Sequence, residues 1–134
     1  MKRNSKGRIV IGVILAVLIL SYAGIELYNS IKENDKTEEF IKKEYELLLT
    51  NDSVNSVVLS TYYPSGWRGG EDIQNVKFED GTSYTIEIRT NITSQDMFFG
   101  NLVKPGVVLK KRIGSDTLSV IKGDTEFQYL IFGK

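Results

Sequence analysis

The residue types best suited to molecular recognition lie together in one stretch, Tyr62-Tyr63-Pro64-Ser65-Gly66-Trp67-Arg68-Gly69-Gly70. It holds the only tryptophan of the chain, and its glycines let a partner approach the backbone closely. Trp, Tyr and Arg anchor many interfaces, and aromatic faces also stack on sugars or bases. This composition predicts a recognition loop, whose candidate partner-binding or ligand-binding residues are Tyr62, Tyr63, Trp67 and Arg68. The alternative is that Trp67 folds inward as part of the core.

Two pairs of adjacent carboxylates, Glu71-Asp72 and Glu79-Asp80, are the other groups with chemical potential. Paired carboxylates can perform glycosidase chemistry, but adjacent ones in turns are more often solvated turn formers. The chain has no cysteine and no histidine, which excludes cysteine nucleophiles, histidine general bases and zinc sites of either type. Neither acidic segment has the alternating oxygen ligands of a calcium loop. We therefore expect no enzyme, no catalytic residues, no cofactor and no metal site.

The longest apolar segment, Ile9–Ile25, contains no charged residue and follows the basic opening Met1–Arg8. A spanning helix needs about 20 apolar residues to cross about 30 Å of hydrocarbon, and extension to Tyr28 supplies that length. The sequence therefore predicts one transmembrane helix that contacts the lipid bilayer through Ile9–Tyr28, preceded by a basic cytoplasmic segment over residues 1–8. By the positive-inside rule, the N-terminus stays in the cytoplasm of a bacterial cell and the C-terminal domain is periplasmic or otherwise extracytoplasmic.

A cleaved secretory signal is the alternative interpretation of the same segment. It would consist of the basic opening, the apolar core Ile9–Leu20 and the cleavage site Ser21-Tyr22-Ala23. The protein would then be secreted after cleavage near Ala23. We favour the uncleaved anchor, because apolar residues continue past Ala23 to Tyr28.

The charges of the chain argue against a nucleic-acid partner. Lysine and arginine together number 17, as do aspartate and glutamate. The basic opening contains Lys2, Arg3, Lys6 and Arg8 and no acidic residue, which leaves 13 basic against 17 acidic residues in the rest. Nucleic-acid binding rests on clustered Lys and Arg, and the balance after the opening is the opposite one.

A polar linker and an amphipathic helix are expected over residues 29–53. Asp35, with Glu38 three residues later, resembles a capping box. Apolar residues then recur at spacings of three and four, namely Phe40, Ile41, Tyr45 and Leu48. The pattern predicts a helix from about Lys36 to Leu49, ended by the turn-forming cluster Thr50–Ser53. Its apolar stripe is expected to cover one face or one open end of a sheet, or alternatively to bind a partner.

Residues 54–134 are expected to form an antiparallel β domain, because Val, Ile, Thr, Tyr and Phe dominate and Gly and Asp interrupt them. About six strands are predicted, near Val57–Tyr63, Ile73–Phe78, Thr82–Arg89, Val107–Ile113, Thr117–Lys122 and Thr125–Phe132. Short strands hide their edges best in a small barrel or a tight two-layer sandwich, with the helix plugging one end. The predicted fold class is a transmembrane helix followed by a mainly β (α+β) domain.

Side-chain alternation fixes the register of the first predicted hairpin. A three-residue loop, Glu79–Gly81, pairs Val76 with Tyr84 and keeps the apolar residues of both strands on one face. It also places Gly81 at the left-handed position of a type I turn with a G1 bulge.

The C-terminal strands are predicted to form a meander. A two-residue Gly123-Asp124 loop pairs Val120 with Phe127 and Leu118 with Tyr129. In the preceding strand, Val107, Leu109 and Ile113 are expected to share the buried face, and Met97, Phe98 and Phe99 are expected to fold over a barrel end.

The basic start with its apolar anchor, the segment Phe78–Tyr84 and the segment Gly106–Val120 carry a family resemblance. On these residues the chain resembles uncharacterised small single-pass membrane-anchored proteins of Bacteroidetes-like bacteria. The shared motifs are turn and core residues, and Val107 departs from the Gly-Asp turn often found at its position. The resemblance implies a fold and a membrane location, and it implies no activity.

The leading hypothesis is therefore a non-enzymatic, membrane-anchored extracytoplasmic domain that binds a protein or envelope component through the Tyr62–Gly70 loop. The alternative is a small-ligand or glycan-binding module that uses Trp67. A second alternative is a carboxylate-dependent hydrolase, which a concave pocket holding two carboxylates within about 10 Å would favour.

Overall fold

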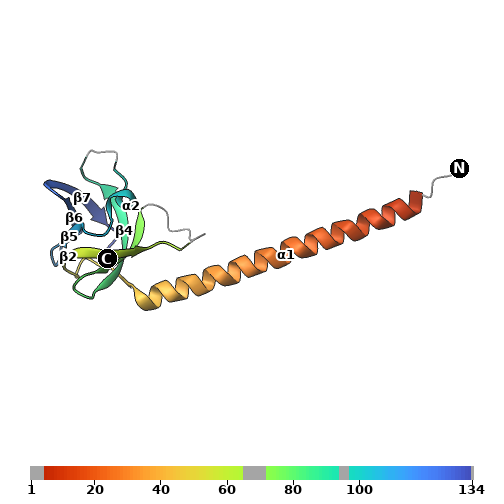
Figure 1. Cartoon of the computed structure of the whole chain (residues 1–134), viewed down its shortest axis with the longest axis horizontal. Coiled ribbons are helices and arrows are strands. Elements are labelled where there is room, and N and C mark those ends of the chain that lie inside the picture. Colours follow the sequence, from red (N-terminus) through yellow and green to blue (C-terminus); the bar gives the residue numbers. More distant parts are fainter. Residues whose placement is uncertain (1–4, 65–71, 94–96, 134) are drawn as a thin grey trace. The chain divides into compact units, whose positions relative to one another are not determined.

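The computed structural model describes residues 5–64, 72–93 and 97–133, and Figure 1 labels both helices and most of the strands. The chain divides into two compact units, Met1–Lys36 and Thr37–Lys134. Helix α1 (Ser5–Glu44) forms the described part of the first unit, and its last residues belong to the second.

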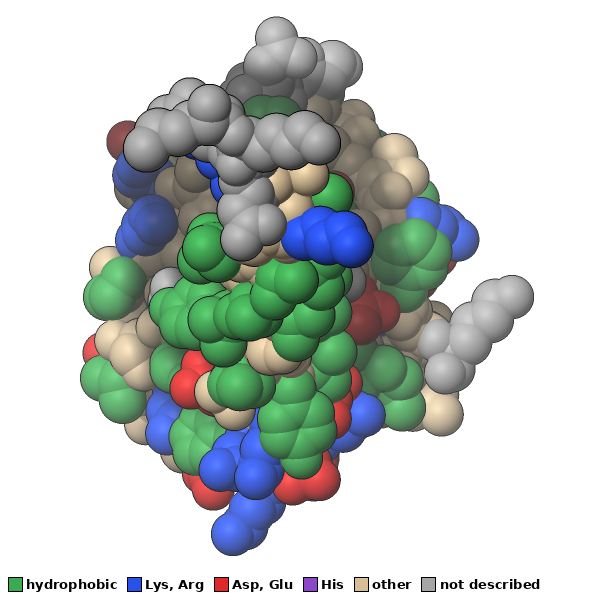
Figure 2. Space-filling model, turned by 90° about the vertical axis from the view of Figure 1, so that its right-hand side faces the viewer, with side chains coloured by type: hydrophobic (Ala, Val, Ile, Leu, Met, Phe, Trp, Pro, Cys, Tyr) green, Lys and Arg blue, Asp and Glu red, His purple; other side chains and the backbone are tan. Residues whose placement is uncertain are grey.

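Helix α1 carries one segment that is long and apolar enough to cross a membrane. Its mean hydropathy is 2.4 and 0% of it is buried. The large apolar side chains from Ile9 to Tyr28 are all exposed, and Figure 2 shows hydrophobic side chains gathered over this helix. Contiguous apolar surface of this extent is unfavourable in water. The predicted N-terminal apolar helix of spanning length is confirmed.

The predicted second helix from Lys36 to Leu49 is wrong in both bounds. Asp35 does not begin a helix, because α1 continues through this region, which contains neither glycine nor proline between Glu26 and Glu44. Lys42 and Lys43 lie in its last turn, where the helix dipole interacts favourably with cations.

After Glu44 the chain leaves the helix for β1 (Glu46–Leu47). This short strand pairs in parallel with β4, and Leu48 N donates to Thr85 O at 2.9 Å. Leu48 is 1% exposed and belongs to the buried core cluster. Sheet pairing and burial of Leu48 therefore override the helical spacing of the apolar residues.

Among the described residues, seven strands form the sheet, in the order β1-β4-β3-β2-β5-β6-β7 with an additional β4–β7 pairing. The strands after β1 are β2 (Val54–Tyr62), β3 (Ile73–Phe78), β4 (Ser83–Asn91), β5 (Val108–Lys111), β6 (Thr117–Lys122) and β7 (Thr125–Ile131). Register shifts lie between Val58 and Ser60 in β2 and between Ile88 and Thr90 in β4. Such irregularities bend strands, and the result is an unevenly closed, sandwich-like barrel. The predicted α+β fold class is confirmed.

Both predicted hairpin registers are confirmed. Val76 pairs with Tyr84 across β3 and β4, and Gly81 has a φ of 89°, in the left-handed region that the bulged turn requires. In the second hairpin, Val120 pairs with Phe127 across β6 and β7.

The predicted burial of Ile113 is wrong. Strand β5 ends at Lys111, and Ile113 beyond it is 73% exposed. Lys111 takes the core-facing position after Leu109 and is 4% exposed. Its Nζ donates to the carbonyl oxygens of Thr50 at 2.7 Å, Asp52 at 2.5 Å and Arg112 at 3.1 Å. These acceptors explain how an ammonium group occupies a buried site.

The apolar segment after β4 only partly matches its prediction. Phe99, the first residue of α2 (Phe99–Leu102), is 0% exposed and packs edge to face on Tyr129 with ring centroids 5.3 Å apart. Met97 and Phe98 are exposed, so this segment buries one of its three large apolar side chains fully.

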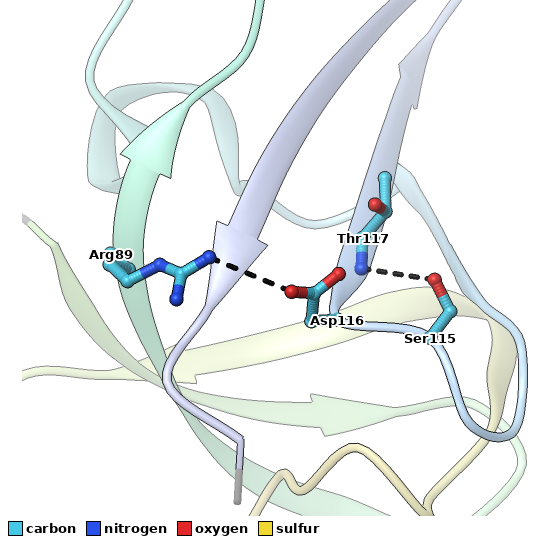
Figure 3. Close-up of polar contacts among 4 residues, drawn as sticks. All are labelled: Arg89, Ser115, Asp116 and Thr117. Atoms are coloured by element: carbon cyan, nitrogen blue, oxygen red, sulfur yellow. Dashed lines mark hydrogen bonds and ion pairs between the residues drawn. The ribbon is translucent and has the colours of Figure 1, made fainter.

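The turn between β5 and β6 contacts β4 and β7 through Asp116. Arg89 of β4 points toward Asp116 of this turn, with Nη2 3.6 Å from Oδ2, and Ser115 Oγ accepts from Thr117 N at 3.1 Å (Figure 3). Asp116 O also accepts from Ile131 N at 2.9 Å. The ion pair is about half exposed, so its own contribution to stability is small.

Candidate functional site: an acidic groove beside an aromatic cluster

The end of α1 lies near β3 and β4, because Ile41 lines one groove together with Ile73 and Thr85. Ile41 lies in the last turn of α1 and Tyr45 directly follows the helix, with Tyr45 N donating to Ile41 O at 2.8 Å. Each of these residues is 5% exposed. Neither belongs to the buried cluster inside the barrel. The Tyr45 ring lies under Lys77 of β3, with Nζ 5.8 Å from the ring centroid. Ile41 and Tyr45 are thus buried outside the core of the barrel, so the end of the helix does not plug the barrel as predicted.

Three rings, those of Phe40, Tyr45 and Tyr62, form an aromatic cluster between the end of α1 and the end of β2. Tyr45 and Tyr62 are stacked, with centroids 6.3 Å apart and an interplanar angle of 5°. Phe40 meets Tyr62 edge to face at 5.6 Å. Aromatic pairs in these arrangements contribute about 0.5–1.5 kcal/mol each beyond their buried area. The cluster therefore joins two elements that are distant in sequence.

Buried Asn75 positions the β2 side of the aromatic cluster. Its Nδ2 donates to Tyr62 O at 3.0 Å, and its Oδ1 accepts from Thr85 Oγ1 at 2.7 Å. Asn75 is 0% exposed, so its amide replaces water for both groups. It fixes the backbone of Tyr62 relative to β3 and β4.

The surroundings of Tyr45 move its pKa further above neutrality than that of an ordinary tyrosine. Burial of the phenol raises the pKa of Tyr45, and the nearby Tyr62 and Glu44 raise it further. Tyr45 is thus a neutral packing residue and not a base.

An acidic groove of about 750 Å³ adjoins the aromatic cluster and shares Tyr45 with it. Its lining comes from α1, β1, the β1–β2 connection, β3 and β4, and consists of Glu38, Ile41, Lys42, Tyr45, Glu46, Leu47, Leu49, Asp52, Ile73, Thr85 and Glu87. The volume is within the range of ligand-binding clefts, which is about 300–1,000 Å³. All of these residues belong to the second unit.

The rim of the acidic groove is predominantly negative. Among the described residues, its lining carboxylates are Glu38, Glu46, Asp52 and Glu87, and the cation that lines it is Lys42. Glu38 and Glu46 are exposed, whereas Asp52 and Glu87 are half-buried. One oxygen of Asp52 is engaged in the fold, because Oδ2 accepts from Leu49 N at 2.8 Å. The remaining carboxylates give the groove a potential that favours cationic groups.

The structure describes only part of the two candidate carboxylate pairs, and the described members lie in turns. Asp80 Oδ1 accepts from Thr82 N at 2.9 Å and from Thr82 Oγ1 at 2.6 Å, so Asp80 forms the β3–β4 turn. Glu71 lies outside the described residues. Within residues 5–64, 72–93 and 97–133, no group of three or more Asp or Glu side chains is placed to hold a metal ion.

The structure places Tyr62 and Tyr63 on the surface at the end of β2, 36% and 49% exposed. Trp67 and Arg68 lie outside the described residues. The sequence prediction missed the contact of Tyr62 with Phe40 and Tyr45. Tyr62 was a candidate for recognition, whereas Phe40 and Tyr45 were assigned to the apolar stripe of the predicted helix. It also missed the acidic groove. The polar residues that line it are of the kind expected on any solvated face of a helix or strand, so they do not indicate a groove.

Comparison of the chain with protein families, curated proteins and solved structures finds no match.

Proposed function

We propose that the chain is a non-enzymatic, membrane-anchored module that binds a protein or another envelope component at the acidic groove and the adjoining aromatic cluster. The observation that carries the proposal is the groove, which combines apolar lining with a charged rim in about 750 Å³. Binding clefts typically combine a mostly apolar surface with a few polar groups that set orientation. The spanning-length helix supplies the anchor.

The proposed orientation puts the N-terminus in the cytoplasm and the second unit in an extracytoplasmic space. The four basic residues before the apolar helix support it through the positive-inside rule. Protease added to intact spheroplasts is expected to digest the second unit. Resistance of that unit in intact spheroplasts, with digestion after lysis, would contradict the orientation. The mass of the membrane-bound product distinguishes an intact anchor from cleavage near Ala23.

The Tyr62–Gly70 stretch remains part of the proposed binding surface, because Tyr62 at its start belongs to the aromatic cluster. Trp67→Ala is expected to weaken capture of the partner with little change in melting temperature. A large fall in melting temperature would instead indicate that Trp67 packs in the core. Weaker binding of a glycan, with protein capture unchanged, would favour the glycan-binding alternative.

The test of the proposed site is photo-crosslinking in native membranes from position 47. Leu47 lines the acidic groove and is 42% exposed, so a photoreactive residue there reaches an occupant without disturbing the core. The matched control is position 113, where Ile113 is 73% exposed and does not line the groove. A defined adduct from position 47 but not from position 113 is expected. Equal adducts from both positions, or none from position 47, would contradict the proposed site.

A further inference from the structure

We infer that the acidic groove binds an extended peptide segment of a partner protein in which a lysine or arginine lies between apolar side chains. The inference rests on the proposed function and specifies the chemical class of its ligand. The charge of the rim, the apolar lining and the backbone edge of β1 together carry it.

The charge of the rim selects a cationic occupant. Among the described lining residues, four carboxylates outnumber the one ammonium group, that of Lys42. The exposed Glu38 and Glu46 can reorient toward an incoming cation. Glu87 on β4 is half-buried, so water screens its charge less than that of an exposed residue. A Lys or Arg is attracted to this rim, whereas an acidic peptide or a phosphate group is repelled.

The lining between the carboxylates selects apolar neighbours for that cation. Apolar side chains contribute to it from the helix, from the β1 region and from the sheet, namely Ile41, Leu47, Leu49 and Ile73. Leu47 is 42% exposed and offers the most accessible surface of the four to a ligand. Covering such a side chain releases water from both partners. A polyamine or a metal ion would satisfy the charges and leave this surface uncovered.

The position of β1 favours an extended conformation of the occupant. Strand β1 lies at the end of the strand order, with β4 as its partner. Leu48 N donates to Thr85 O at 2.9 Å on the β4 side. Backbone groups alternate in direction along a strand, so the N–H and C=O of Leu47 point away from β4. A peptide strand can pair with such an edge, as in recognition by strand addition.

The test uses the full-length chain in nanodiscs of zwitterionic phosphatidylcholine, so that anionic lipid does not compete for basic peptides. A displayed library of random twelve-residue peptides is selected against these nanodiscs, with empty nanodiscs as background. We expect enriched peptides in which Lys or Arg is flanked by Leu, Ile, Val or aromatic residues. Their affinity is expected to fall as the sodium chloride concentration rises.

Charge-neutral variants locate the binding site of the selected peptides. Glu46→Gln and Glu87→Gln are each expected to weaken binding about two- to fivefold, the range for partly exposed ion pairs. Glu126→Gln is the matched control, because Glu126 of β7 is exposed and does not line the groove. Leu47→Ala is expected to weaken binding without altering its salt dependence. Unchanged melting temperatures show that each variant is folded.

Several outcomes overturn the inference. Enrichment of acidic peptides, of apolar peptides without a cation, or of no peptide above background contradicts the ligand class. If native mass spectrometry detects phospholipid that the protein retains and the Leu47→Ala variant loses, an acyl chain occupies the groove. If the protein forms dimers that depend on the groove residues, a second copy of the chain occupies it. If position 47 still crosslinks a defined partner in membranes, the proposed function stands and only this inference fails.

Discussion

At the scale of single residues, Lys111 shows how a charged side chain can serve the fold. Its position follows Leu109 on the core-facing side of β5, where strand alternation favours an apolar residue. The ammonium group instead ties β5 to the β1–β2 connection through Thr50 O and Asp52 O. That connection carries Leu49 and Asp52, which line the acidic groove. Lys111 therefore supports the groove from inside the domain.

Replacing Lys111 with methionine is expected to lower the free energy of unfolding by about 1–3 kcal/mol, because carbonyl groups at a buried site lose their donor. For a domain of this size, that loss corresponds to a fall in melting temperature of at least about 4 °C. Thermal unfolding of the full chain in detergent micelles, followed by circular dichroism, measures it. The matched control is Lys110→Met, because Lys110 is the exposed neighbour on the same strand. Equal effects of the two substitutions would contradict the role assigned to Lys111.

At the scale of elements, sequence alternation predicted the two hairpins because a strand has a side-chain period of two. A slip of one residue at Val76–Tyr84 or Val120–Phe127 would reverse every face, so the pattern leaves one register. The end of α1 was not predictable in the same way. The spacing of Ile41, Tyr45 and Leu48 fits a longer helix equally well, and the choice depends on pairing with a strand that is distant in sequence.

The candidate site shows the same limit. Residue type was enough to single out Tyr62, since aromatic side chains at the end of a strand are candidates for recognition. Its partners Phe40 and Tyr45 come from another element, and their contact follows from where α1 ends. The acidic groove requires α1, β1, β3 and β4 to meet, which no local pattern specifies. Buried Asn75 has no sequence signal, because a polar residue in a strand normally indicates a solvated face.

The aromatic cluster makes a prediction about the end of α1. Tyr62→Ala removes the edge-to-face contact with Phe40 and the stacking on Tyr45, so the last helical turns lose part of their attachment. Hydrogen–deuterium exchange of the amides at residues 37–44 is expected to quicken about two- to tenfold. Exchange in β6 and β7 should stay unchanged.

The matched control for this prediction is Leu59→Ala, which removes a 56% exposed side chain from the same strand. It is expected to leave exchange at residues 37–44 unchanged. If Tyr62→Ala accelerates exchange throughout the barrel, Tyr62 stabilises the whole domain and the local role is wrong.

At the scale of the whole chain, the protein combines an apolar helix of spanning length with a domain whose strands pair around a closed sheet. β4 pairs with β3 along its first part and with β7 along its second, which closes the sheet. Closure leaves few strand edges for unwanted pairing, and the two-residue β1 lies at the end of the strand order. Both residues of this short strand, Glu46 and Leu47, also line the acidic groove.

Stability of the β domain is expected to fall in alkaline solution. Burial raises the pKa of Tyr129, with Asp72 adding to the effect, and burial likewise raises the pKa values of Tyr45 and Tyr84. Unfolded tyrosines ionise at their ordinary value of 10.0, so above it the folded chain binds more protons than the unfolded chain. Folding is then disfavoured progressively as the pH rises. The stabilisation is complete below 10.0 and is lost through the raised values.

Lys111 acts in the opposite direction over a limited range, because burial lowers its pKa from 10.5 although Asp52 and Asp116 raise it. Between the lowered value and 10.5, the unfolded chain binds more protons and stability rises with pH. Above that range Lys111 no longer opposes the tyrosines, so the free energy of unfolding should fall as the pH rises beyond 10.5 while the raised tyrosines ionise. Urea titrations from about pH 9 to about pH 11.5, with tyrosinate absorbance followed in parallel, measure the slope. Tyr129→Phe should make it shallower, and an unchanged slope in this variant would contradict the contribution assigned to Tyr129.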